Sequence, residues 1–446
     1  MTHFRTINYN RSLPPNPADA AMTRVRWGML ALVFFATTIN YLDRILLGFL
    51  IPFIRAEMSI SDLQYGYIAG AFQIAYTVGF LFTGKLIDKI GTRIGYAASL
   101  IWWSLAAMFH SIATGPLSLG IWRGMLGLGE SGNFPAAIKS VTEWFPKRDR
   151  AFATGIFNAG TNVASMSGPP LFAWMYGIFG WRACFLITAA TGFVWLVFWI
   201  LHYRTPERHK SVSQAELDYI RSDQEDAGKS SVGWMQALGY RQTWGFAIAK
   251  FFTDPVWWFY LFWLPSYLHD VRKFDMKQIS WALPVIYLMA DLGSVGGGWI
   301  SGYLIRRGWS NGTARKTAMA LCAGCMPVAA MCVLAESSVT TIGLMALATA
   351  AHQGWSANLY TTASDVFPKQ AIASITGIGG CLGGLGGFLF SAIIPGYVVT
   401  HYGYTPVFLT MGAFHLTALL LLHRLMGDLR PIGEQLQSPR VGRQSN

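Results

Sequence analysis

The sequence predicts an all-α membrane protein, with twelve transmembrane helices in two pseudo-symmetric six-helix bundles. Three observations support this fold class: an apolar composition, an uneven distribution of basic residues, and an internal repeat with a period of half the chain. Of the 446 residues, 53% are hydrophobic and 13% are charged. A globular domain typically carries about 25% charged residues, so the composition is typical of a membrane protein.

Apolar runs recur along the chain, and each is close to the ~20 residues that a helix needs to cross a hydrocarbon core. The first 26 residues are polar and include Pro14, Pro15 and Pro17. Because they lack the apolar core of a signal peptide, we expect no cleavable signal peptide at this end. The predicted helices span residues 27–53, 63–84, 94–113, 117–138, 151–175, 182–202, 244–269, 279–305, 317–335, 341–365, 372–398 and 406–426.

Basic residues are concentrated on one side of the predicted membrane. With a cytoplasmic N-terminus, the cytoplasmic loops and tails hold 26 of the 34 lysines and arginines, the outside loops hold 5, and the spans hold 3. This bias follows the positive-inside rule and predicts that both termini are cytoplasmic. The net charge of +12 is therefore a signal of topology in a lipid bilayer, and we expect no nucleic-acid partner.

The chain repeats itself at about half its length. Phe145-Pro146-Lys147 recurs as Phe367-Pro368-Lys369, 222 residues later. Such a period is typical of a secondary transporter built from two duplicated halves. The sequence is accordingly divided into a cytoplasmic tail, a six-helix bundle, a cytoplasmic linker, a second six-helix bundle and a second cytoplasmic tail, at residues 1–26, 27–202, 203–243, 244–426 and 427–446.

The charged linker contains one local structural signal. Ser213-x-x-Glu216 is the pattern of a capping box and predicts a short helix that lies on the cytoplasmic surface. This helix has either a functional role or the role of a plain connection between the bundles.

Ionisable side chains inside the predicted spans point to a transported solute. Each costs ~2.5–3.5 kcal/mol in hydrocarbon even on a lenient scale, so such residues are expected to face a wet cavity, bind a solute or move protons. The arginines predict an anionic substrate, and the carboxylates predict groups that titrate during transport. The residues form three pairs: Asp43 with Arg44, Arg123 with Glu130, and Lys250 with Asp254.

A charged, glycine-containing loop follows the second predicted helix, with the pattern Gly84-x-x-x-Asp88-Lys89-x-Gly91-x-Arg93. It resembles the signature loop of the major facilitator superfamily, and the twelve spans and the duplication extend this resemblance over nearly the whole chain. We expect Asp88 and the basic residues to bind helix ends and neighbouring helices on the cytoplasmic side. They would form a latch that breaks when the protein opens to that side.

Two segments within the membrane resemble the anion:cation symporter branch of this superfamily. They are Asn40-Tyr41-Leu-Asp43-Arg44 and Arg123-x6-Glu130. This branch includes proton-coupled carriers of sugar acids, so the resemblance implies an organic-anion substrate and protons as the coupled ion.

Three further segments resemble the hexuronate transporters of that branch. The resemblance implies a monomer in the bacterial inner membrane that imports glucuronate or galacturonate together with protons. The segments are Glu143-Trp-Phe-Pro-Lys147, Lys250-Phe-Phe-Thr-Asp254-Pro-Val-Trp257-Trp258 and His352-Gln-Gly-Trp355-Ser-Ala-Asn358.

The chemistry of a sugar acid selects candidate binding residues. Its carboxylate favours a planar guanidinium that forms two parallel hydrogen bonds, which Arg44 offers. Its hydroxyls favour amides, phenols and indoles, although lone polar side chains in helices also bond across helices. Asp254, four residues after Lys250, would alternatively neutralise that lysine. The candidate substrate-binding residues are Arg44, Tyr41, Asn40, Gln73, Tyr76, Asn158, Asn162, Lys250, Trp257, Tyr260, His352, Gln353 and Asn358.

The candidate proton-coupling residues are Asp43, Glu130 and Arg123. Arg123 and Glu130 are seven residues apart, which is ~10.5 Å along a straight helix, so they share a face without lying in direct contact. If Arg123 pairs with Glu130 in one conformation only, the carboxylate releases its proton there. The alternative is that the acidic and basic residues form permanent ion pairs.

Other functions remain as alternatives with different sequence requirements. The same fold serves carriers of other organic anions, such as aldonates or aldarates, as well as anion exchangers and drug-proton antiporters. An enzyme or sensor would need a reactive cluster or a large soluble domain, and the longest hydrophilic insert is 203–241. The sequence contains no P-loop, catalytic triad or metal-binding pattern, so we expect no enzymatic activity, cofactor or metal site.

Overall fold

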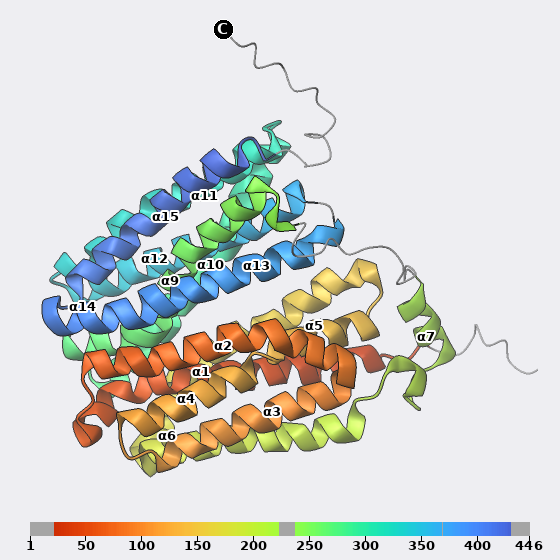
Figure 1. Cartoon of the computed structure of the whole chain (residues 1–446), viewed down its shortest axis with the longest axis horizontal. Helices are drawn as coiled ribbons and strands as arrows, with labels where there is room; N and C mark the ends of the chain where they lie inside the picture. Colours follow the sequence, from red (N-terminus) through yellow and green to blue (C-terminus); the bar gives the residue numbers. More distant parts are fainter. Residues whose placement is uncertain (1–21, 223–236, 368, 430–446) are drawn as a thin grey trace, which may run out of the picture.

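The computed structural model describes residues 22–222, 237–367 and 369–429, and these residues are almost entirely helical. Figure 1 shows two groups of helices side by side, the first coloured red to yellow-green and the second green to blue. The N-terminal set consists of α1 (Val25–Met58), α2 (Asp62–Ile90), α3 (Thr92–Phe109), α4 (Pro116–Glu130), α5 (Asn133–Trp144) and α6 (Lys147–His202). The C-terminal set consists of α9 (Arg241–Asp270), α10 (Met276–Arg306), α11 (Asn311–Ala330), α12 (Ser338–Val366), α13 (Lys369–Gly387), α14 (Ile394–Tyr402) and α15 (Thr405–Met426).

Short helical segments complete the described chain. They are the 3₁₀ turns η2 (His110–Ile112), η3 (Pro206–Arg208) and η4 (Met331–Leu334), the π-helical segment η5 (Phe388–Ile393), and α7 (Gln214–Arg221) in the linker. Seven helical segments of the described chain are long and apolar enough to cross a membrane. The predicted all-helical character is confirmed for the described residues. The predicted bounds of the two bundles stay predictions, and most of the predicted tails lies outside the described residues.

Two predicted helices, at 117–138 and 372–398, are interrupted where the prediction had them continuous. The span at 117–138 is broken into α4 and α5 at Ser131 and Gly132, directly after Glu130. The predicted break between the spans at 151–175 and 182–202 is confirmed, because α6 comprises two helices that meet at Gly180, whose non-helical φ of 76° is readily adopted only by glycine. The span at 372–398 is divided by η5, where the indole N–H of Trp263 donates to the Ser391 carbonyl oxygen at 2.8 Å.

The helix ends define two sides of the molecule. The linker side carries α7, the start of α1 and the end of α15, and the far side carries the connections 59–61, 271–275 and 403–404. On the far side the two sets are in close contact. A Cβ on Gly66 of α2 would lie 2.7 Å from the Ala392 carbonyl oxygen. The Tyr65 hydroxyl donates to the Phe262 carbonyl oxygen of α9 at 2.6 Å.

An ion-pair cluster at the end of α1 adds to this closure of the far side. Arg55 Nη1 lies 2.7 Å from Asp62 Oδ1 of α2 and 3.1 Å from Asp270 Oδ2 of α9. His269 Nδ1 in turn lies 2.8 Å from Asp270 Oδ1. The far side is therefore closed by backbone contact, a buried hydroxyl and a charged cluster that joins the two sets.

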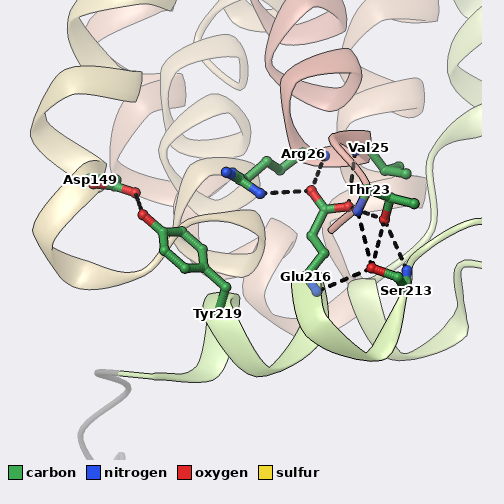
Figure 2. A network of polar contacts seen from close by, with 7 residues as sticks. All are labelled: Thr23, Val25, Arg26, Asp149, Ser213, Glu216 and Tyr219. Carbon is green, nitrogen blue, oxygen red and sulfur yellow. Dashed lines mark hydrogen bonds and ion pairs between the residues drawn. The ribbon is translucent and has the colours of Figure 1, made fainter. Parts of the chain in front are cut away.

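The linker helix α7 is fixed to the start of α1 by a buried carboxylate (Figure 2). Glu216 is fully buried and accepts hydrogen bonds from the backbone N–H groups of Val25 at 3.0 Å and Arg26 at 3.1 Å. It also accepts from Arg26 Nη1 at 3.0 Å and from the Thr23 hydroxyl at 2.6 Å. A carboxylate at this position satisfies N–H groups of the first turn of α1 and complements the positive end of its dipole.

The predicted capping box is half correct. Ser213 is the N-cap of α7 and accepts from the Glu216 N–H at 3.3 Å. The Glu216 carboxylate, however, caps α1 instead of returning to Ser213, and the Ser213 N–H donates to the Thr23 hydroxyl at 2.9 Å. The Tyr219 hydroxyl donates to Asp149 of α6 at 2.7 Å. The helix α7 is thus attached on the linker side to both α1 and α6 of the N-terminal set.

We expect Glu216→Ala to lower the thermal unfolding midpoint of the purified protein strongly. The substitution leaves the buried Arg26 and two backbone N–H groups without their partner, a loss of ~3–5 kcal/mol for a buried charge pair. Glu207→Ala is the matched control, since Glu207 lies 3.3 Å from Arg221 and both side chains are about half exposed. Such a surface pair contributes about 0–1 kcal/mol, so equal midpoints for the two variants would contradict this account.

Candidate functional site

A cavity of about 420 Å³ lies between the two sets of helices. Its lining comes from α2, α5, α9, α12 and α13, and runs from the middle of these helices towards the linker side. The volume falls in the usual range of small-molecule pockets, ~300–1,000 Å³. Among the described lining residues, Lys250 and Asp254 carry charge, and Gln73, Tyr76 and Tyr360 offer polar atoms.

The ion pair between Arg44 and Glu130 lies directly behind this lining. Arg44 Nε donates to Glu130 Oε2 at 2.7 Å, and Arg44 Nη2 donates to Asn40 Oδ1 at 3.2 Å. Arg44 is 1% exposed and Glu130 is fully buried. The other carboxylate oxygen, Glu130 Oε1, has no hydrogen-bond partner in the described chain. Arg44 therefore donates to one oxygen of the Glu130 carboxylate, and the other oxygen accepts no hydrogen bond in the described chain.

Aromatic rings surround the Arg44 guanidinium. Its central carbon lies 4.7 Å from the ring centres of both Tyr41 and Tyr76, and 5.4 Å from that of Trp258. Tyr76 and Trp258 also line the cavity, so their rings separate Arg44 from it. Trp258 belongs to α9 of the C-terminal set, whereas Arg44 belongs to α1. The position of this arginine relative to the cavity thus depends on how the two sets are placed.

Arg123 occupies a different position from the predicted one. Its Nη2 donates to the backbone carbonyl oxygen of Arg44 at 2.5 Å, and its guanidinium lies 4.8 Å from the Phe72 ring centre. Its Nε and Nη1 have no hydrogen-bond partner in the described chain. Arg123 does not pair with Glu130 in this conformation, because its guanidinium reaches the Arg44 carbonyl oxygen while Arg44 donates to Glu130.

Asp43 points away from Arg44, as adjacent positions on a helix must. It is buried within the N-terminal set beside Thr188 of α6, and neither of its oxygens accepts a well-formed hydrogen bond in the described chain. The Thr188 hydroxyl donates to the Phe185 carbonyl oxygen instead, at 3.4 Å. Within the described residues, Asp43 therefore forms no ion pair with Arg44 or with another cation, and it is a buried carboxyl.

Lys250 and Asp254 form the charged part of the cavity wall. Lys250 Nζ lies 2.7 Å from Asp254 Oδ2 and donates to the Tyr360 hydroxyl at 2.9 Å. The Asp254 side chain is 23% exposed and that of Lys250 is 4% exposed. The alternative in which Asp254 neutralises Lys250 is thus the observed one. Tyr360 was missed by sequence reasoning, because one more tyrosine in an aromatic-rich chain gives no signal.

Several candidate substrate-binding residues lie away from the cavity. The Asn358 amide donates to the carbonyl oxygens of Gly297 and Gly354, both at 2.9 Å, and so holds α10 against α12. Tyr260 is buried among aromatic rings that include Phe408. These two side chains serve helix packing, which is the common role of polar groups and large rings in membrane helices.

His352 is also directed into the C-terminal set. Its Nδ1 lies 3.2 Å from Nε2 of His415 on α15, and its ring stacks on Trp257 with centres 5.9 Å apart. His415 was not identified from the sequence, since a lone histidine in an apolar helix has no pattern around it. Three other candidates, Asn158, Asn162 and Gln353, are not among the described cavity-lining residues.

In the described chain, the polar contacts of the signature-loop residues Asp88 and Arg93 are with the N-terminal set. Asp88 Oδ1 lies 2.9 Å from Lys139 Nζ of α5, and Arg93 Nη2 donates to the Ile200 carbonyl oxygen of α6 at 2.7 Å. Gly91 has a φ of 87°, which explains the glycine between α2 and α3. Gly84 faces Pro135 of α5, where a Cβ would lie 4.0 Å away, and Lys89 is exposed. This loop therefore joins the linker-side ends of α2, α3, α5 and α6.

Comparisons with known proteins agree with this architecture. A hexuronate transporter of Escherichia coli strain K12 is 33% identical over 405 residues, covering 89% of this chain and 93% of that protein. A D-galactonate transporter of E. coli O6:H1 is 29% identical over 434 residues, covering 94% and 99%. An inward-facing, unoccupied structure of a bacterial homologue of the human lysosomal transporter Spinster has a TM-score of 0.66 at 18% identity, covering 91% and 96%.

These similarities confirm the predicted fold class of twelve helices in two six-helix bundles. The sequence pattern of the Major Facilitator Superfamily matches residues 33–391, which is most of the chain. The chain therefore belongs to the major facilitator superfamily of membrane transporters.

Proposed function

We propose that this protein imports a hexuronate, such as glucuronate or galacturonate, by proton symport with alternating access. The observation that carries the proposal is the ion pair between Arg44 and Glu130 behind the cavity wall, with Nε and Oε2 2.7 Å apart. The named substrates of similar carriers, a hexuronate and D-galactonate, support a sugar-acid anion as the solute.

Competition for the Arg44 guanidinium would couple transport of the substrate to transport of the proton. The substrate carboxylate and Glu130 both favour Arg44, and two carboxylates cannot share one cation in a medium of low dielectric without strong repulsion. Protonation of Glu130 removes its charge and frees the guanidinium for bidentate binding of the substrate. Asp43, buried nearby without a direct cation, is the second proposed proton site.

The same competition fits the energetics of import. A monoanion that enters a cell against 100 mV costs ~2.3 kcal/mol, and one accompanying proton makes the cycle electroneutral. Two protons, one on each of Glu130 and Asp43, would make import electrically favourable. The two buried carboxyls are compatible with either stoichiometry.

The closed far side and the cavity on the linker side support an alternating-access cycle. We propose that the linker side is the cytoplasm, in keeping with the 26 basic residues assigned to it. In this conformation Tyr76 and Trp258 cover Arg44, and Gln73, Lys250 and Tyr360 would contact the hydroxyls of a solute in the cavity. The contact between Arg55 of α1 and Asp270 of α9 would break when the far side opens.

An aldonate is the second candidate substrate. The similarity to a D-galactonate transporter over 94% of this chain favours it, and an aldonate offers the same single carboxylate to Arg44. Uptake into proteoliposomes of labelled galacturonate, glucuronate and galactonate, each with and without an inward pH gradient, tests the proposal. Absence of gradient-driven uptake for all three would contradict it.

We expect Glu130→Gln to abolish accumulation driven by a pH gradient while counterflow exchange of substrate continues. A neutral amide resembles the protonated carboxyl at every pH, so Arg44 stays available but no proton is released. Glu57→Gln is the matched control, because Glu57 lies at the far-side end of α1 with its side chain about half exposed. A Glu130→Gln protein that still concentrates substrate would exclude Glu130 as the coupling site.

The proposed orientation predicts opposite labelling of two single cysteines. In a background without the five native cysteines, Val339→Cys on the far side should react with an impermeant maleimide in intact cells. Lys210→Cys on the linker side should react only after the cells are opened. Both native side chains are exposed, so burial does not confound the comparison. The reverse pattern would overturn the orientation.

A further inference from the structure

The charged part of the cavity wall is an ion pair whose carboxylate is its more exposed member. Lys250 and Asp254 are the two charged residues of its described lining, and they cancel each other at 2.7 Å. Lys250 has a further partner in Tyr360, at 2.9 Å. The lysine is nearly buried, whereas Asp254 is the more exposed member of the pair. A solute in the cavity would therefore meet carboxylate oxygen before it meets ammonium.

Helix α13 provides the space that this pair needs. A Cβ on Gly379 would lie 2.9 Å from Lys250 Cδ, and a Cβ on Gly383 would overlap the Asp254 carboxylate. Both glycines have ordinary helical geometry, so their role is close approach and not an unusual backbone conformation. The glycine-rich segment of α13 thus fits around the pair and fixes the Asp254 carboxylate at the cavity surface.

We propose that Asp254 is a specificity-determining residue that admits sugar acids with one carboxylate and rejects those with a carboxylate at each end. The inference rests on the proposed function, in which Arg44 takes the first carboxylate. Tyr76 and Trp258 contact Arg44 and line the same cavity as Asp254, so a solute that moved these two rings aside would extend from Arg44 towards Asp254. Asp254 would meet the end of the solute that points away from Arg44.

The charges explain the discrimination. A hydroxyl at that end donates to the Asp254 carboxylate, so a hexuronate or aldonate gains a charge-assisted hydrogen bond. A second carboxylate has no proton to donate and meets a like charge, and Lys250 is already satisfied by Asp254 and Tyr360. Rejection by a fixed like charge is a common way to separate two similar ligands.

The test compares galactarate with its monoamide, which has the same carbon skeleton but one carboxylate. Binding to purified wild-type protein is measured by competition against labelled galacturonate. We expect the monoamide to compete at concentrations at least about tenfold lower than galactarate, because only the diacid places a charge beside Asp254. Equal competition by the two compounds would overturn the inference, and this comparison requires no variant to fold.

Asp254→Asn should reduce the ratio of the galactarate to the monoamide concentration needed for competition by about tenfold or more. The substitution removes the repulsion and leaves Lys250 free for the second carboxylate. The double substitution of Lys250→Gln with Asp254→Asn should reduce the ratio less, because no cation is released. Asp291→Asn on α10 is the matched control, since Asp291 does not line the cavity. An unchanged ratio in Asp254→Asn would contradict the proposed role.

The same data separate this inference from the proposed function. Wild-type protein that binds galacturonate but does not distinguish galactarate from its monoamide would overturn the role of Asp254 alone. Wild-type protein that binds none of the three compounds would overturn the proposed hexuronate function, and the inference with it.

Discussion

The ion pair between Arg44 and Glu130 places a cation and a titratable carboxyl in a medium where neither is stable alone. An unpaired charge within the membrane costs several kcal/mol, so each residue requires the other or a substitute. A substrate carboxylate can replace Glu130 as the partner of Arg44, and a proton can replace Arg44 in neutralising Glu130. The proposed coupling needs no long-range signal, because both exchanges occur on the same guanidinium.

The rest of the architecture places this pair between the closed far side and the cavity on the linker side. On the far side, Gly66 approaches the backbone of the other set, Tyr65 bonds to the Phe262 carbonyl, and Arg55 joins Asp62 and Asp270. On the linker side, Tyr76 and Trp258 cover Arg44 towards the cavity. Because Trp258 belongs to the C-terminal set, a movement of one set against the other would change both the cover of Arg44 and the far-side contacts.

The elements that could be predicted from the sequence are those with a strong local signal. Apolar runs revealed the helices, and charges within them identified Arg44, Glu130, Lys250 and Asp254 as unusual. Partner choice could not be predicted, because it depends on which helices are neighbours. Glu130 pairs with Arg44, 86 residues away, and Glu216 caps a helix that begins about 190 residues before it. Tyr360 and His415 lack any surrounding pattern, and Asn358 resembles a ligand but holds two helices together.

The most direct measurement is an experimental structure of the protein with galacturonate bound. The account predicts that the substrate carboxylate lies against the Arg44 guanidinium and that Glu130 is no longer within ion-pair distance of it. A substrate carboxylate bound at Lys250, with Arg44 Nε and Glu130 Oε2 still 2.7 Å apart as in the present conformation, would contradict it.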